Sequence, residues 1–133
     1  MLGKIHLYFG IFIVIVFLFT GQYLKYTFHH TKDLDLMNRA LFRAGHLYIL
    51  LFGLINASLG THLKLSKLKL IKLVQQLGSI VIFIASFLVV YGFFKELPTT
   101  DINRRITHYS LYLILLGVSM HGLISILNNI LKK

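Results

Sequence analysis

The sequence predicts an all-α membrane protein in which four transmembrane helices form an up-down-up-down bundle. Hydrophobic residues make up 56% of its 133 residues, which is more apolar surface than a soluble domain of this length can bury. Four runs without Asp, Glu, Lys or Arg, of 20, 20, 22 and 26 residues, occupy most of the chain. A bilayer core about 30 Å thick requires roughly 20 such residues per helix. Backbone groups in lipid must find partners within the segment, so each run is expected to be helical.

The four runs predict one domain, residues 1–133, with helices over about residues 5–23, 36–60, 73–94 and 103–131. The first run begins like a secretory signal peptide, because Lys4 precedes it. Its apolar stretch is long, however, and no small-residue cleavage site follows "FLFTGQYLKY", so we expect a retained span. Residues suited to cap the second and fourth helices precede them: Asp33 or Asp35, and Thr99, Thr100 and Asp101.

Short connections predict that consecutive helices are antiparallel neighbours, so both termini share one end with the middle loop. We call this the lysine end; its charged residues are Lys4, Lys64, Lys67, Lys69, Lys72, Lys132 and Lys133. The opposite, arginine end carries seven basic and four acidic residues, among them Arg39, Arg43, Arg104 and Arg105. The dense lysine loop favours the lysine end as the cytoplasmic one, in a bacterial inner membrane.

The basic residues carry a formal net charge of +10, which in a soluble protein would suggest nucleic acid. Here they flank apolar helices, so topology is the better explanation and no nucleic-acid partner is expected. The segment "LKLSKLKLIK" could hold anionic lipid head groups. An ordinary positive-inside loop explains the same residues, and we favour it.

Polar residues fall on defined helix faces. In the second span, Gly53, Ala57 and Gly60 continue the face of His46 and make a small-residue strip, which predicts close contact with another helix. In the fourth span, the most polar stripe is expected to face the interior; it comprises Asn103, Thr107, Ser110, Gly117, His121 and Asn128. In the first span, one face carries His6, Gly10, Ile13, Phe17 and Thr20.

Depth and direction together define two candidate sites. The first, toward the lysine end, combines His6, His121 and Asn56, with Gln75 or Gln76 at its mouth. The second, toward the arginine end, combines His46 with Arg43, Arg39 and Tyr91, and has His108 and Arg105 at its rim. His29, His30 and His62 are expected to be solvated loop residues, and the adjacent pair His29 and His30 is only a weak metal-binding signal.

Four membrane helices with inward histidines resemble the architecture of membrane b-type cytochromes. The resemblance implies haem b held by two imidazoles, for which His6 and His121 are best matched in depth and His46 is a third candidate. Gly10 and Gly117 could make room for a porphyrin. Arg39 and Arg43 could contact propionates or lipid, although they lie at the end away from His6 and His121.

"FTGQYLK" followed by "RAGHLYILL" is similar to small four-span bacterial membrane proteins of unassigned function. The chain has no Cys, no acidic residue inside a span, and no phosphate loop or zinc motif, so catalysis is weakly supported. We therefore expect a non-catalytic accessory or scaffold subunit that contacts a membrane-protein partner or a second copy. The alternative is a haem-binding electron-transfer subunit.

Overall fold

A computed structural model describes residues 1–30, 35–96 and 103–130. Its elements are four helices: α1 (Leu2–His30), α2 (Leu36–His62), α3 (Lys69–Lys95) and α4 (Arg105–Ile130). Each is long and apolar enough to cross a membrane. The predicted all-α bundle with four membrane-length helices is therefore confirmed.

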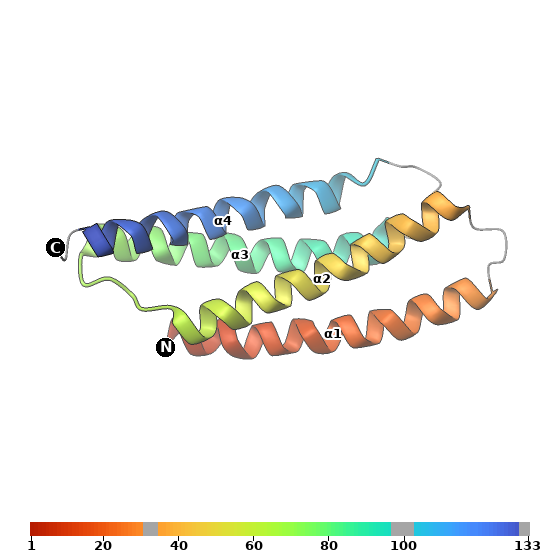
Figure 1. Cartoon of the computed structure of the whole chain (residues 1–133), viewed down its shortest axis with the longest axis horizontal. Helices are drawn as coiled ribbons and strands as arrows, with labels where there is room; N and C mark the ends of the chain where they lie inside the picture. Colours follow the sequence, from red (N-terminus) through yellow and green to blue (C-terminus); the bar gives the residue numbers. More distant parts are fainter. Residues whose placement is uncertain (31–34, 97–102, 131–133) are drawn as a thin grey trace.

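The helices run up and down, as predicted (Figure 1). The beginning of α1 and the end of α4 lie at the same end as residues 63–68, which join α2 to α3. Backbone packing is closest between α1 and α2 and between α3 and α4, and looser between α2 and α3. The molecule is thus built from two helical hairpins placed side by side.

Two helices are longer than the apolar runs predict. Helix α1 continues beyond Lys25 to His30, and α3 begins at Lys69 within the lysine-rich segment. A run without charged residues predicts only the part of a helix that can lie in the hydrocarbon core of a membrane, not the full length of the helix. Lys and Leu are good helix formers, and neither Gly nor Pro interrupts residues 22–30 or 69–77, so the helices extend further.

Glycines allow the two helices of the first hairpin to approach closely. A Cβ placed on Gly10 would lie 2.8 Å from the carbonyl oxygen of Gly53 and 2.9 Å from Cα of Ala57. One placed on Gly60 would lie 2.5 Å from Cα of Leu7. The predicted small-residue strip of α2 is therefore confirmed as a helix interface, and its partner is α1.

A glycine also allows close approach of the two helices of the second hairpin. A Cβ on Gly117 of α4 would lie 2.9 Å from the carbonyl oxygen of Gly78 on α3 and 2.5 Å from Cγ1 of Ile82. Apolar side chains fill the space where the hairpins meet. The buried core includes Ile13, Phe42, Ile49, Phe52, Ile82, Ala85, Val89, Phe93 and Ile114.

Helix α4 is capped by a residue that the sequence did not suggest. One Glu96 carboxylate oxygen accepts a hydrogen bond from the Ile106 amide at 2.7 Å, and the other accepts one from the Thr107 hydroxyl at 2.6 Å. An acidic group here offsets the positive end of the helix dipole. The predicted caps Thr99, Thr100 and Asp101 lie outside the described residues.

Of the two aspartates predicted to cap α2, one lies at the N-cap position of the helix. Asp35 occupies the N-cap position, but its side chain makes no capping hydrogen bond; its carbonyl oxygen accepts one from the Arg39 amide at 3.1 Å. The alternative cap, Asp33, lies outside the described residues.

We predict opposite effects of alanine at two glycines. Gly10→Ala forces its Cβ against the α2 backbone and should lower the free energy of unfolding by about 1–3 kcal/mol. Gly122→Ala is the matched control, because nothing lies within 4 Å of its Cβ. It should leave stability unchanged or raise it by up to about 1 kcal/mol. Unfolding in mixed detergent micelles, followed by circular dichroism, measures both; equal stability of the two variants would contradict the interface.

Candidate functional site

A chain of hydrogen bonds connects three helices near the lysine end. Nδ1 of His6 on α1 lies 2.8 Å from Oδ1 of Asn56 on α2. The Asn56 amide nitrogen donates to the Ser86 hydroxyl of α3 at 2.9 Å, and also to the carbonyl oxygen of Phe52 at 2.9 Å. His6, Asn56 and Ser86 are each fully buried. The structure therefore brings together two of the residues predicted for this site and adds Ser86.

The hydrogen-bond acceptors along this series of bonds determine which atoms of Ser86, Asn56 and His6 donate. The Ser86 hydroxyl donates to the carbonyl oxygen of Ile82 at 2.8 Å, so its oxygen is left to accept from Asn56. The Phe52 carbonyl can only accept, so the Asn56 amide nitrogen must face it and Oδ1 must face His6. Nδ1 of His6 therefore carries a proton, and when the ring is neutral its Nε2 has a lone pair.

The lone pair on His6 has no hydrogen-bond partner within the described part of the chain. The His6 ring stacks on Phe83 with centroids 4.3 Å apart, and meets the His121 ring edge-on at 6.4 Å. A buried acceptor without a partner is costly, so it marks a position where a donor, a water or a metal ion would be stabilised.

His121 is the second predicted ligand, and it faces inward as expected. Its Nε2 lies 3.2 Å from the Ser79 hydroxyl of α3, and the side chain is 8% exposed. The predicted polar stripe of α4 is largely confirmed, because Thr107, Ser110 and His121 are buried. Asn103 is the exception; it lies before the helix and is exposed.

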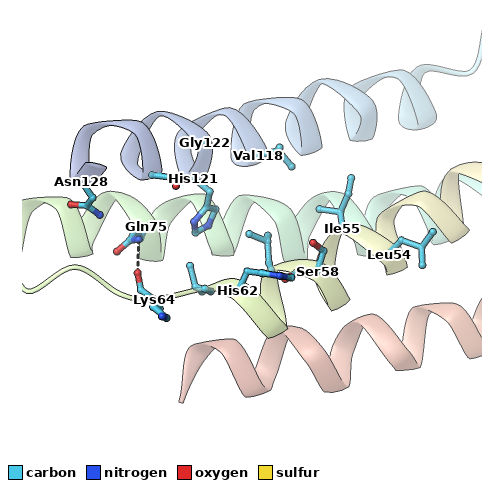
Figure 2. A pocket seen from close by; sticks show the side chains of 13 residues that line it. Leu54, Ile55, Ser58, His62, Lys64, Gln75, Val118, His121, Gly122 and Asn128 are labelled. Carbon is cyan, nitrogen blue, oxygen red and sulfur yellow. Dashed lines mark hydrogen bonds between the residues drawn. The ribbon is translucent and has the colours of Figure 1, made fainter. Parts of the chain in front are cut away.

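A pocket of about 650 Å³ lies beside His121. It is lined by α2, by the following loop, by Gln75 of α3 and by the second half of α4 (Figure 2). Gln75 holds the loop, since its Oε1 accepts from the Ser66 amide at 2.8 Å and its Nε2 donates to the Lys64 carbonyl at 3.1 Å. Gln75 thus lines this pocket, which includes His121 but neither His6 nor Asn56, whereas Gln76 is exposed outside it.

His46 makes an independent contact at the other end of the first hairpin. The Thr20 hydroxyl oxygen lies 2.9 Å from the carbonyl oxygen of Phe17, to which it can donate, and 2.9 Å from Nδ1 of His46, with which it forms a hydrogen bond. The His46 ring stacks on Phe17 with centroids 4.0 Å apart. His46 therefore faces another helix, as predicted, and that helix is α1.

The remaining residues predicted for the arginine-end site do not gather around His46. Arg43, Tyr91, Arg105 and His108 are exposed, and Arg39 is half-buried. Arg104, another arginine of the arginine end, is buried, with only 5% of the residue exposed.

Arg104 reaches across the bundle instead. It donates to the carbonyl oxygen of Leu41 at 3.2 Å and lies 4.5 Å from the centre of the Phe42 ring. The guanidinium thus ties the start of α4 to α2.

The glycines expected to make room for a porphyrin do not do so. The space beside Gly10 is filled by the α2 backbone, and the space beside Gly117 by Ile82 and the α3 backbone. Both glycines are used for helix packing, which is the commoner role of small residues in membrane helices.

Two of the three histidines expected in loops have described side chains. His29 and His62 are exposed, as expected, but both belong to helices, and His62 bonds to the Ser58 carbonyl at 3.0 Å. His30 ends α1. Within the described ranges, no group of three or more His, Asp or Glu side chains is arranged to hold a metal ion.

Comparison with known proteins found no matching family model, no matching curated protein and no matching solved structure. The resemblances to b-type cytochromes and to small four-span bacterial proteins therefore stay predictions.

Several bonding residues were missed, although signals for them exist. Ser79 and Ser86 are seven residues apart on α3, a spacing that places both on one face, and Arg104 precedes Thr107 by three residues on the polar stripe. Thr20 shares one predicted face of α1 with His6 and Phe17, but spacing within α1 does not predict its bond to His46.

A double-mutant cycle should reveal the His6–Asn56 bond. His6→Phe keeps the ring stacked on Phe83, and Asn56→Leu removes the acceptor. We expect a coupling free energy of about 0.5–2 kcal/mol in detergent unfolding. The control cycle pairs His6→Phe with Thr20→Val, a residue bonded to His46; these effects should add within about 0.5 kcal/mol. Additivity in both cycles would show that the bond contributes nothing to stability.

Proposed function

We propose that this chain is an integral protein of the bacterial inner membrane and acts as a non-catalytic accessory or scaffold subunit of a membrane complex. Four helices of membrane length support insertion. The observation that carries the proposal is that the interior polar side chains bond to one another: His6 to Asn56, His46 to Thr20, and His121 to Ser79. Side chains that bond to each other across helices in this way hold the helices together, which is a structural role.

A stripe on the outside of α1 is the face we assign to a partner. Tyr8, Phe12, Ile15 and Phe19 follow each other at steps of four, three and four residues, and all are exposed. This spacing places the four side chains on one face of α1. The occupant would be a helix of a partner protein or of a second copy.

The partner face can be tested by placing a photocrosslinking amino acid at Phe12 in membranes of the source cell. The matched control is Leu115 on α4, which is also exposed and apolar. We expect a discrete protein adduct from Phe12 and only lipid adducts from Leu115, because only the first lies on the assigned stripe. Lipid adducts alone from both positions would contradict an accessory role through α1.

A second candidate function is haem-dependent electron transfer, and one observation favours it. His6 donates its Nδ1 proton to Asn56 and keeps Nε2 bare, which is how metal-binding histidines are usually held. His121 on a different helix would be the second ligand. When bound, haem would supply a one-electron redox centre. The donor set fits this role, but the filled spaces at Gly10 and Gly117 leave no slot for the ring at those positions.

The haem candidate predicts a coloured protein. The test is the visible spectrum of the detergent-purified chain, oxidised and then reduced with dithionite. A Soret band with sharpened α and β bands, lost in His6→Ala and His121→Ala but kept in the exposed control His62→Ala, would support it. A preparation that stays colourless after expression with haem precursor would exclude it and leave the accessory role.

A further inference from the structure

The pocket beside His121 has a polar end and an apolar end. Lys64, Gln75 and Asn128 lie toward the lysine end, whereas Leu54, Ile55 and Val118 lie toward the middle of the bundle (Figure 2). In an inserted chain, the first group is near the membrane surface and the second is at hydrocarbon depth. An amphiphile with one polar end would therefore enter with the same orientation as the surrounding lipids.

The charge of the polar end is positive. Lys64 lines the pocket, and no carboxylate is among the lining residues that the structure describes. Lys67, Lys69 and Lys72 follow in the same loop and first turn of α3. Gln75, Ser125 and Asn128 add neutral hydrogen-bonding groups. This combination of a cation with neutral donors suits a phosphate group and disfavours a cationic head.

The pocket lies where two helices do not close against each other. Helices α2 and α4 line its opposite sides, and over their described residues they lack the close backbone packing found within each hairpin. Gly122 of α4 contributes to the opening, because a Cβ there would meet nothing within 4 Å. The cavity of about 650 Å³ is within the usual size of a ligand site and is partly open.

We propose that this pocket binds one anionic phospholipid, with its phosphate at Lys64 and Asn128 and one acyl chain along Leu54, Ile55 and Val118. The proposal rests on membrane insertion, which is part of the proposed function, but not on either the accessory or the haem role. It assigns a specific lipid site to the gap between the hairpins, beyond the general attraction of a lysine-rich loop to anionic membranes.

The test is native mass spectrometry of the full chain in mild detergent with equal amounts of dioleoyl phosphatidylglycerol and dioleoyl phosphatidylcholine. We expect one retained phosphatidylglycerol per chain. Gly122→Leu should abolish this complex by filling the opening, while Gly122→Ala, which adds little volume, should keep it. Circular dichroism of both variants checks that they remain folded, as expected for helix-favouring substitutions in open space.

A charge variant separates the site from bulk attraction. Lys64→Gln should lower the preference for phosphatidylglycerol over phosphatidylcholine about fivefold, the usual effect of one basic residue near an anionic lipid. Lys67→Gln makes the same charge change in the same loop but outside the pocket, and should have a clearly smaller effect.

Three results would overturn the proposal. These are equal lipid retention by Gly122→Leu and Gly122→Ala, equal loss of preference in the two lysine variants, and displacement of the lipid by a second copy of the chain. Insertion is checked separately by carbonate extraction of membranes. A chain released by carbonate would contradict the proposed function itself, whereas an inserted chain that retains no phosphatidylglycerol contradicts only the lipid site.

Discussion

The arrangement of this protein depends on the Asn56 carboxamide, which joins three helices inside an apolar interior. Its oxygen accepts from His6 on α1, and its nitrogen donates to Ser86 on α3 and to its own helix. Neither lipid nor a packed core can replace these partners, so each group would remain unsatisfied if the helices separated. This bond network also crosses between the two hairpins, where backbone packing is looser.

The glycines make this bonding possible. Gly10 lies one turn after His6 on the same face of α1, and its lack of a side chain lets the backbone of α2 approach at Gly53 and Ala57. Only a close α1–α2 approach brings the short Asn56 side chain within 2.8 Å of the imidazole. Small residues and buried polar residues therefore act together: the first set the distance between helices, and the second fix their register.

Much of this architecture could be predicted from the sequence. The charge-free runs predicted four helices and their order, and helical spacing placed His6, Asn56 and His121 toward the interior. Spacing could not predict which side chains bond to each other, because bonding depends on how each helix is rotated about its axis. The serines Ser79 and Ser86 are identified as partners only once α3 is packed against its neighbours. It also could not separate Arg104, which is buried, from its neighbour Arg105, which is exposed.

The lysine end contains two environments: a partly open pocket, and a buried interior in which polar side chains are hydrogen-bonded. His121 belongs to both, since it contacts Ser79 inside the bundle and lines the pocket (Figure 2). The His6 ring, whose Nε2 is buried, stacks on Phe83. The hydrogen bonds give Nδ1 of His6 and both polar groups of Asn56 a partner, and they leave Nε2 of His6 without one among the described residues.

The most direct test is therefore the tautomer of His6, measured by ¹⁵N nuclear magnetic resonance of the histidine-labelled chain in lipid, with His6→Phe to assign the signal. The network predicts a neutral ring protonated at Nδ1, with a scalar or dipolar coupling to the Asn56 side chain. A neutral ring protonated only at Nε2 would contradict it, because Nδ1 could then no longer donate to Asn56.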